Sequence, residues 1–141
     1  MSMNTNVNVV RIPATVETNF FKYWFEFLKP YHKLTSREID VISELVKIRF
    51  QLSKVILDED VLDSVLMSED TKKKVREICK IKLSHFQVIM GKLRKHGIII
   101  NDKINKRFIP NIKEDAKDFR LIFYFDLDGF KGNSSTSSKT T

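Results

Sequence analysis

The chain has 141 residues, of which 42% are hydrophobic and 30% are charged, a composition that supports one compact domain and excludes most large enzyme folds. Its 25 Lys and Arg against 18 Asp and Glu give a formal net charge of +7, so we expect an acidic partner, either nucleic acid or an acidic protein surface. The single cysteine, Cys79, excludes an internal disulfide and is typical of a protein that folds in a reducing compartment. No apolar stretch is long enough to span a bilayer and the first residues do not resemble a secretory leader, so neither membrane insertion nor secretion is expected.

Residues 1–16 are predicted to form an extended N-terminal arm. The run from Val7 to Ile12 is rich in β-branched residues and ends at Pro13, which favours an arm or an edge strand. From Glu17 onward, apolar residues recur at helical spacing and predict a helix that ends before Pro30. We interpret its aromatic face either as an anchor of the core or as a partner-binding surface; this face comprises Phe20, Phe21, Trp24 and Phe25.

Two further helices are predicted in the middle of the chain. Thr35 and Glu38 have the spacing of a capping box, in which each side chain satisfies a free backbone N–H, and they predict a helix from Ser36 to about Ser53. Residues 58–67 predict a shorter helix, and Ser68 has the residue type of an N-cap for the helix after it.

Residues 75–99 show the order of elements of a helix-turn-helix. The helix that begins after Ser68 is expected to end near Cys79, and to point Val75, Ile78 and Cys79 inward. Ser84 and Gln87 have the spacing of a second capping box, which predicts a helix running to His96, with Gly97 as its C-terminal glycine.

A β-hairpin is predicted directly after this helix. Its strands are Ile98–Ile100 and Lys103–Ile109, joined by a turn at Asn101 and Asp102. The hairpin carries the basic residues Lys103, Lys106 and Arg107, which we expect to form a basic wing. Helix, turn, capped helix and basic hairpin together predict a winged helix-turn-helix.

The segment from Val75 to Ile99 also resembles the helix-turn-helix and wing entry of MarR-type winged-helix regulators. Its closing run, Lys95 to Ile99, is similar to the K-x-G-L-I of that family. Lys80 stands where the family has the glycine of the turn, and Gly91 lies inside the second helix, where glycine costs about 1 kcal/mol relative to alanine. The positions that the family keeps apolar are occupied here by Val75, Cys79, Ile81, Phe86, Ile89, Met90 and Leu93.

A broader resemblance extends over much of the chain. The Lys-, Ile- and Asn-rich composition fits an AT-rich genome, and several segments look like a small winged-helix protein encoded by crAss-like tailed phages of Bacteroidales. This resemblance implies a virion protein, because small proteins of this size often build rings at the head-to-tail junction of such phages. The segments are FFKYWFEFLKP, HKLTSREIDVI, HFQVIMGKLRKHGII, NDKINKRFIP and FRLIFYFDL.

The C-terminal part is predicted to add a strand over residues 119–127. Apolar residues alternate along it, so one face is wholly apolar and is expected to be buried, either against the wing or against another subunit. Residues 17–130 are therefore expected to form the winged-helix domain, and residues 131–141 a flexible polar tail. The predicted fold is α+β and mostly helical, with a small antiparallel sheet made of the wing hairpin and the C-terminal strand.

The second helix of the motif is expected to expose one face to a partner. In a regulator this face enters the major groove of DNA, where Gln pairs with adenine and Lys with guanine. Its apolar members suit a protein contact better, so both uses stay open. The face, with residues at its ends, comprises Leu83, Ser84, His85, Gln87, Val88, Lys92 and Lys95.

No constellation in the sequence points to catalysis. His32 lies apart from His85 and His96, which lie at opposite ends of one predicted helix; none has metal-ligand spacing, and no glycine-rich phosphate loop is present. We therefore expect a non-enzymatic protein without cofactor, metal, small-molecule substrate or membrane.

Two functions remain open. The first is a structural adaptor of a tailed-phage virion that binds copies of itself or other virion proteins and resides in the virion, or in the host cytoplasm before assembly. The second is a winged-helix DNA-binding transcription regulator.

Overall fold

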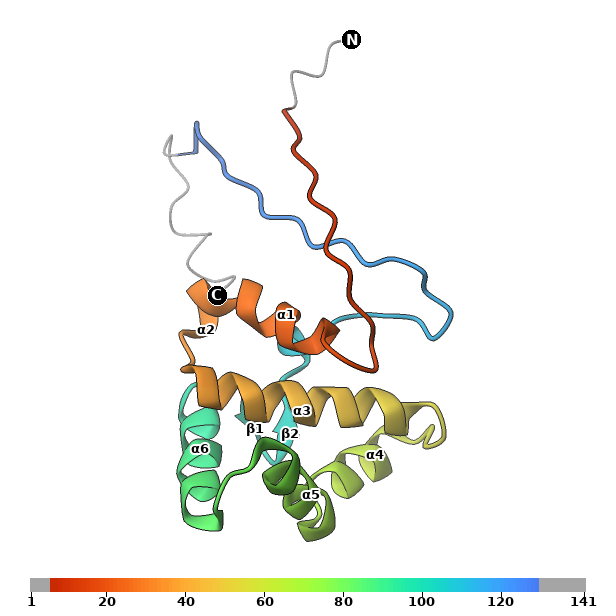
Figure 1. Ribbon diagram of the computed structural model, residues 1–141, viewed down its shortest axis with the longest axis vertical. Helices are drawn as coiled ribbons and strands as arrows, with labels where there is room; N and C mark the ends of the chain where they lie inside the picture. Colours follow the sequence, from red (N-terminus) through yellow and green to blue (C-terminus); the bar gives the residue numbers. More distant parts are fainter. Residues whose placement is uncertain (1–5, 130–141) are drawn as a thin grey trace.

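The computed structural model describes residues 6–129, which form a helical body with a short hairpin and two extended segments that leave the body (Figure 1). The expected tail, residues 131–141, lies outside the described residues, as do residues 1–5 of the N-terminal arm. The helices are α1 (Phe20–Phe27), α2 (Lys29–His32), α3 (Ser36–Ser53), α4 (Glu59–Leu66), α5 (Glu69–Cys79) and α6 (Leu83–Lys95); the strands are β1 (Ile99–Ile100) and β2 (Lys103–Ile104), followed by the 3-10 helix η1 (Lys106–Phe108).

Helix α3 is the central element of the body, with α1 on one side and α5 and α6 on the other (Figure 1). Its predicted capping box is confirmed: the Thr35 hydroxyl accepts a hydrogen bond from the Glu38 amide at 3.3 Å, and the Glu38 carboxylate accepts one from the Thr35 amide at 3.0 Å. The predicted bounds of the helix, Ser36 to Ser53, are also confirmed. This agreement arises because both cap partners lie within one turn of each other, so the signal is local.

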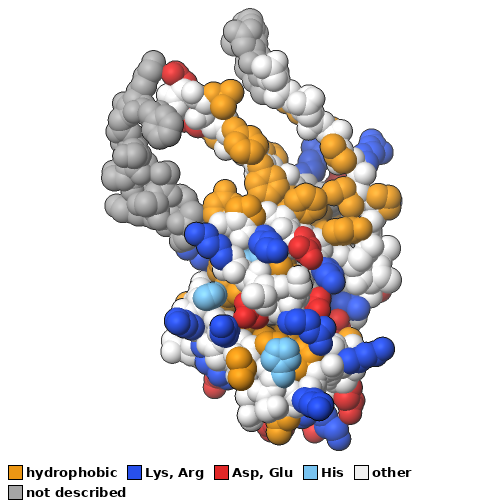
Figure 2. Space-filling model, turned by 60° about the vertical axis from the view of Figure 1, so that its left-hand side comes forward, with side chains coloured by type: hydrophobic (Ala, Val, Ile, Leu, Met, Phe, Trp, Pro, Cys, Tyr) orange, Lys and Arg blue, Asp and Glu red, His pale blue; other side chains and the backbone are white. Residues whose placement is uncertain are grey.

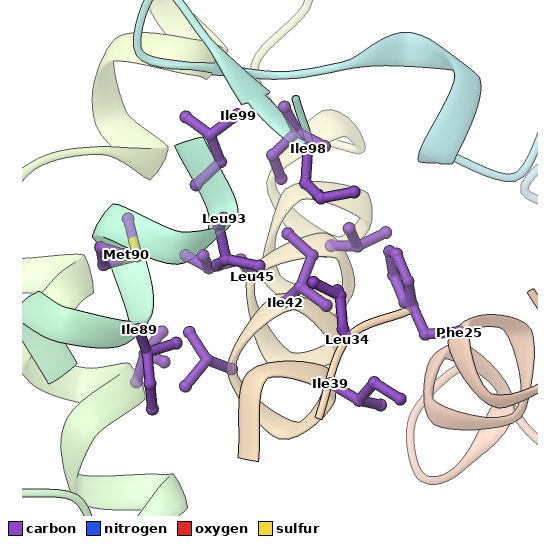
Figure 3. Close-up of a cluster of buried hydrophobic side chains, with 14 of the residues drawn as sticks. Phe25, Leu34, Ile39, Ile42, Leu45, Ile89, Met90, Leu93, Ile98 and Ile99 are labelled. Atoms are coloured by element: carbon purple, nitrogen blue, oxygen red, sulfur yellow. The ribbon is translucent and has the colours of Figure 1, made fainter. Parts of the chain in front are cut away.

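The core is built around the two apolar sides of α3 (Figure 3). On one side, Ile39 and Ile42 pack with Phe25 of α1 and Leu34 of the α2–α3 loop, and on the other Leu45 faces the apolar residues of α6. Each fully buried large apolar side chain contributes about 1.5–3 kcal/mol of transfer free energy. The α6 and hairpin members of the core are Phe86, Ile89, Met90, Leu93, Ile98, Ile99 and Ile104.

Helices α5 and α6 are joined by a turn whose backbone is left-handed at Lys80, with φ of 56°. Ser68 caps α5 as predicted, and the helix ends at Cys79. The predicted capping box of Ser84 and Gln87 is wrong. The amide of Phe86 already donates to the carbonyl oxygen of Lys82 at 2.9 Å, so α6 begins before Ser84 and its N-cap residue is Lys82.

The inward orientation predicted for α5 holds for only part of that helix. Val75 is fully buried and Cys79 is half-buried, but Ile78 is 47% exposed. The prediction for Ile78 is wrong because α5 presents only a narrow stripe to α3, and Ile78 lies at the margin of that stripe.

The hairpin after α6 is confirmed, but its second strand is shorter than predicted. Gly97 ends the helix with φ of 74°, and Asn101 and Asp102 take positive φ values that suit a two-residue hairpin turn. Strand β2 does not continue to Ile109, because Asn105 begins η1 by accepting a hydrogen bond from the Arg107 amide at 3.1 Å. Lys106 and Arg107 therefore lie on η1 and not on a strand.

The C-terminal strand predicted over residues 119–127 does not pair with any other part of residues 6–129. The segment is extended, but the only sheet among residues 6–129 is the β1–β2 pair. Its predicted apolar face is only partly covered: Phe119 and Leu121 are half-buried, but Phe125 is 79% exposed and Leu127 is 94% exposed. The reason is that β1 and β2 are two residues long, so the body offers this segment no strand edge of matching length.

Candidate binding surfaces

The exposed face predicted for the second helix of the motif is present on α6. All seven of its predicted residues are exposed, while Phe86, Ile89, Met90 and Leu93 are buried on the opposite side. Leu83 and Val88 are about half exposed, at 50% and 56%, and they lie among His85, Gln87 and Lys92. We call this set of seven residues, from Leu83 to Lys95, the α6 face; it combines two exposed apolar side chains with five polar or charged side chains.

Positive charge is concentrated on α6, which carries this face, and on the neighbouring helix α5. Residues 69–97 contain nine Lys and Arg but three Asp and Glu. Lys92, Arg94 and Lys95 form no ion pair with any residue of the described range 6–129. These three charges are therefore not paired with a carboxylate of the described chain. They are exposed on α6, where they can attract an acidic partner.

The wing lysines behave differently, because acidic residues of α4 neutralise them. Lys103 pairs with Asp60, with Nζ and Oδ1 3.4 Å apart, and Lys106 pairs with Glu59, with Nζ and Oε1 3.1 Å apart. These four side chains are at least half exposed, so each pair contributes only about 0–1 kcal/mol and a phosphate can compete for the lysine. The sequence did not reveal these partners, since the paired residues are more than forty positions apart.

The aromatic face predicted on the first helix is divided between two roles. Phe21 and Phe25 are buried in the core of the protomer, at 3% and 0% exposure, so the expectation that they contact a partner does not hold. Phe20 and Trp24 are half-buried, and both contact the ring of Phe119, with ring centroids 5.2 and 5.7 Å from it. The sequence missed Phe119 as a partner of α1 because its position depends on the path of the chain after the wing.

Residues 119–127, which we call the C-terminal arm, expose a run of large apolar side chains. Beyond Phe119, the arm contacts the body through Phe123, whose ring centroid lies 6.3 Å from that of Phe27. Figure 2 shows hydrophobic side chains gathered along the upper, extended part of the molecule, with Lys and Arg spread over the helices below. The exposed large apolar residues of the arm are Ile122, Phe123, Tyr124, Phe125 and Leu127.

The titratable groups inside the body have structural partners. His32 is buried between the carbonyl oxygen of Phe25, 2.7 Å from Nε2, and the amide of Leu34, which donates to Nδ1 at 3.0 Å. Burial lowers the pKa of His32. Burial, together with the nearby carboxylates of Glu44 and Asp40, raises the pKa of the Cys79 thiol to about 11. A thiol with this pKa is almost wholly protonated near neutral pH and is a poor nucleophile.

A shallow cavity of about 290 Å³ lies between α3 and the segment after η1. It is lined by Phe21, Phe50 and Ile109 together with Arg49, Glu59 and Lys106. Glu59 and Lys106 pair with each other across it. Within residues 6–129, no group of three or more His, Cys, Asp or Glu side chains is arranged to hold a metal ion.

Comparisons with known proteins do not extend these observations. No family model, curated protein or solved structure matches the chain. Among the described helices, none has the length and apolar character needed to cross a membrane. The features of the described chain that bear on function are the α6 face and the C-terminal arm.

Proposed function

We propose that the protein is a non-enzymatic structural adaptor, which uses a winged helix-turn-helix body as a scaffold and the C-terminal arm as the part that binds neighbouring subunits. The observation that carries the proposal is the arm itself. It exposes five large apolar side chains and leaves the protomer without a strand partner for its backbone among residues 6–129.

An arm of this kind is costly for an isolated monomer. Contiguous exposed apolar surface is rare on soluble monomers and marks sites of association. Unpaired backbone groups of an extended segment are also a template for pairing with another chain. Both costs are removed when the arm is covered by a second subunit.

The expected setting is the virion of a tailed phage. The resemblance of five sequence segments to a small winged-helix protein of crAss-like phages supports this setting, and ring proteins at a head-to-tail junction need contacts between copies or with neighbouring virion proteins. The adaptor role then places the protein in the virion, or in the host cytoplasm before assembly.

The experiment is a measurement of association by analytical ultracentrifugation over a range of protein concentrations. We expect the full chain to associate, and Phe125→Asp with Leu127→Asp to shift it to monomer, because two charges then lie on the exposed apolar arm. The matched control is Val55→Asp with Leu57→Asp, which adds the same charges at residues that are 77% and 90% exposed in the α3–α4 loop. A chain that stays monomeric at every concentration contradicts the proposed association.

A second candidate function, nucleic-acid binding by a regulator, is favoured by the charge on α5 and α6. Nine Lys and Arg against three Asp and Glu in residues 69–97 produce a positive surface around the α6 face. In this function Gln87 contacts a base edge, and Lys92 and Lys95 contact a base or phosphates. Leu83 and Val88 then contact thymine methyl groups.

The test for this candidate is binding to a short random DNA duplex across a salt series. Affinity that falls steeply with salt supports it, because each phosphate contact adds a slope of about −0.9 to the dependence of log K on log salt. Lys92→Glu with Lys95→Glu removes binding in that case, whereas Lys113→Glu with Lys117→Glu, an equal charge change in the exposed segment after the wing, leaves it nearly unchanged. Association that persists while DNA binding is absent at all salt concentrations favours the adaptor.

A further inference from the structure

The backbone of the C-terminal arm is available over most of its length. Among residues 6–129, no hydrogen bond reaches the N–H or C=O groups of residues 119–125. The arm is held to its own body by ring contacts of Phe119 and Phe123 with α1. Residues 119–125 are therefore extended and unpaired along both edges, as a strand must be to join another strand. Asp126 begins a turn, in which its carbonyl oxygen accepts from the Gly129 amide at 3.3 Å and its Oδ1 accepts from the Asp128 amide at 3.2 Å, and this exposed turn has to open when residues 126 and 127 pair.

We propose that the C-terminal arms of two copies of this chain pair as an antiparallel two-stranded ribbon, with the two Phe123 residues opposite each other on a two-fold axis. This inference rests on the proposed adaptor function, and it identifies the partner of the arm as the arm of a second copy of the chain. Because both arms use the same residues around a two-fold axis, the contact joins two copies and leaves no unpaired arm to bind a third.

Charge complementarity favours antiparallel pairing of two arms, and the number of apolar pairs favours this register. When Phe123 lies opposite Phe123, Arg120 of each copy lies opposite Asp126 of the other, so the ribbon contains two attractive cross-strand pairs. The neighbouring register, centred on Tyr124, pairs Arg120 with Asp128 instead, but it places Asp126 opposite the apolar Ile122 and Phe119 opposite Gly129, so fewer apolar side chains face each other. A parallel in-register pair places Arg120 beside Arg120 and Asp126 beside Asp126, which is unfavourable at both positions.

The remaining pairs in this register are apolar. Phe119 lies opposite Leu127, Leu121 opposite Phe125, and Ile122 opposite Tyr124. Aromatic and β-branched residues in such cross-strand pairs stabilise a sheet more than alanine does. Just beyond them, Asp118 and Asp128 oppose each other, so we expect the pairing to end at residues 119 and 127.

One face of the ribbon can pack on helix α1 of each copy. Side chains alternate along a strand, so the odd-numbered residues from 119 to 127 form one apolar face. Phe119 belongs to this face and already packs on Phe20 and Trp24. The opposite face carries the Arg120 and Asp126 pairs on either side of Ile122 and Tyr124. In the monomer Arg120 pairs with Asp118 at 3.7 Å, in a contact that is 84% and 76% exposed and therefore weak enough to rearrange.

A charge exchange tests the register in the full chain by sedimentation equilibrium. We expect Arg120→Asp and Asp126→Arg each to weaken dimerisation about tenfold, because each creates two like-charge pairs, and the double variant to restore the wild-type affinity. Restoration separates this contact from the pair within the monomer, because the double variant places Asp at position 120 beside Asp118. A double variant that stays as weak as the single variants overturns the proposal.

Cross-linking tests the two-fold position directly. In a Cys79→Ser background, Phe123→Cys is expected to form a disulfide-linked dimer under mild oxidation, since residues opposite each other in antiparallel strands have Cα atoms about 4.5–5.5 Å apart. Leu127→Cys is the control. In this register the two Leu127 residues are eight positions apart along the ribbon, or about 27 Å, so no link forms. Efficient linking at 127 without linking at 123 overturns the register.

These results are separable from those that test the proposed function. Loss of association in the Phe125→Asp, Leu127→Asp variant without restoration by the charge exchange retains the adaptor function and rejects arm-to-arm pairing. Loss of association on deleting residues 1–12, with no effect of the single charge variants, assigns the partner strand to the N-terminal arm and also rejects it. A monomeric full chain rejects both.

Discussion

The indole Nε1 of Trp24 donates a hydrogen bond of 2.9 Å to the carbonyl oxygen of Phe108, joining residues that are 84 positions apart in the chain. This bond fastens α1 to η1, the element that follows the hairpin. It therefore holds the two ends of the body together close to the point from which the C-terminal arm leaves.

Replacing Trp24 by Phe is expected to lower the free energy of unfolding by about 1 kcal/mol, because the carbonyl oxygen of Phe108 loses its donor while most of the ring packing is kept. The measurement is urea unfolding followed by far-ultraviolet circular dichroism. Tyr23→Phe, on the exposed side of the same helix, is the control and is expected to change the value by less than about 0.5 kcal/mol. Equal effects of the two variants contradict a specific role for the Trp24 bond.

The two glycines around α6 are expected to respond to alanine in opposite directions. Gly91 lies inside the helix and an added Cβ meets no atom within 4 Å, so Gly91→Ala should raise the free energy of unfolding by about 0.5–1 kcal/mol. At Gly97 an added Cβ also meets nothing within 4 Å, but φ is +74°, so Gly97→Ala should lower it by about 1 kcal/mol. Thermal or urea unfolding of both variants checks the prediction, and a shift of the same sign in both contradicts it.

A buried ion pair joins α3 to α4 through Arg49 and Asp63, whose Nε and Oδ1 atoms are 3.2 Å apart and whose side chains are 12% and 11% exposed. Asp63→Ala leaves the guanidinium buried without its partner and is expected to cost about 3 kcal/mol. The double variant Arg49→Met with Asp63→Leu should recover most of this loss, since no charge is then left unpaired. Glu59→Ala, which breaks the exposed pair with Lys106, is the control and should cost less than about 1 kcal/mol. An equal loss in Asp63→Ala and Glu59→Ala would contradict this account.

The parts of the fold that the sequence predicted are those with local signals. The capping box of Thr35 and Glu38, the cap at Ser68, the glycine at 97 and the turn at Asn101 and Asp102 each depend on residues within one turn of one another. The same locality explains why the buried and exposed sides of α6 were predicted correctly, since helical periodicity alone assigns them. The false capping box at Ser84 had the correct spacing, but Ser84 is the second residue of α6, two positions after the N-cap Lys82.

The parts that could not be predicted depend on contacts between distant segments. Alternation along residues 119–127 indicates that a face is to be buried, but it does not say which chain supplies the covering surface. In the same way, nothing in the spacing of Lys103 and Lys106 indicates that α4 brings Asp60 and Glu59 to them. The exposed side of α6 was therefore predicted correctly, because it is a property of one helix, whereas the acidic partners of Lys103 and Lys106 and the exposure of the arm were not predicted.

Buried His32 makes the stability of the body depend on pH. Burial holds the pKa of the folded imidazole below its usual 6.5, and Nδ1 is occupied as the acceptor of the Leu34 amide, so a proton there breaks that bond. As the pH falls below about 6.5, the unfolded chain takes up a proton at this side chain before the folded chain does, and the free energy of unfolding decreases. This part of the stability is fully present above the unfolded pKa and is lost as the pH falls through the folded pKa.

Urea unfolding between about pH 7.5 and pH 5.5, above the range in which ordinary carboxylates titrate, measures how the free energy of unfolding changes with pH. We expect His32→Gln to flatten this dependence, while His85→Gln, which alters an exposed histidine of α6, leaves it as in the wild type. A slope that persists in His32→Gln assigns the pH dependence to another group.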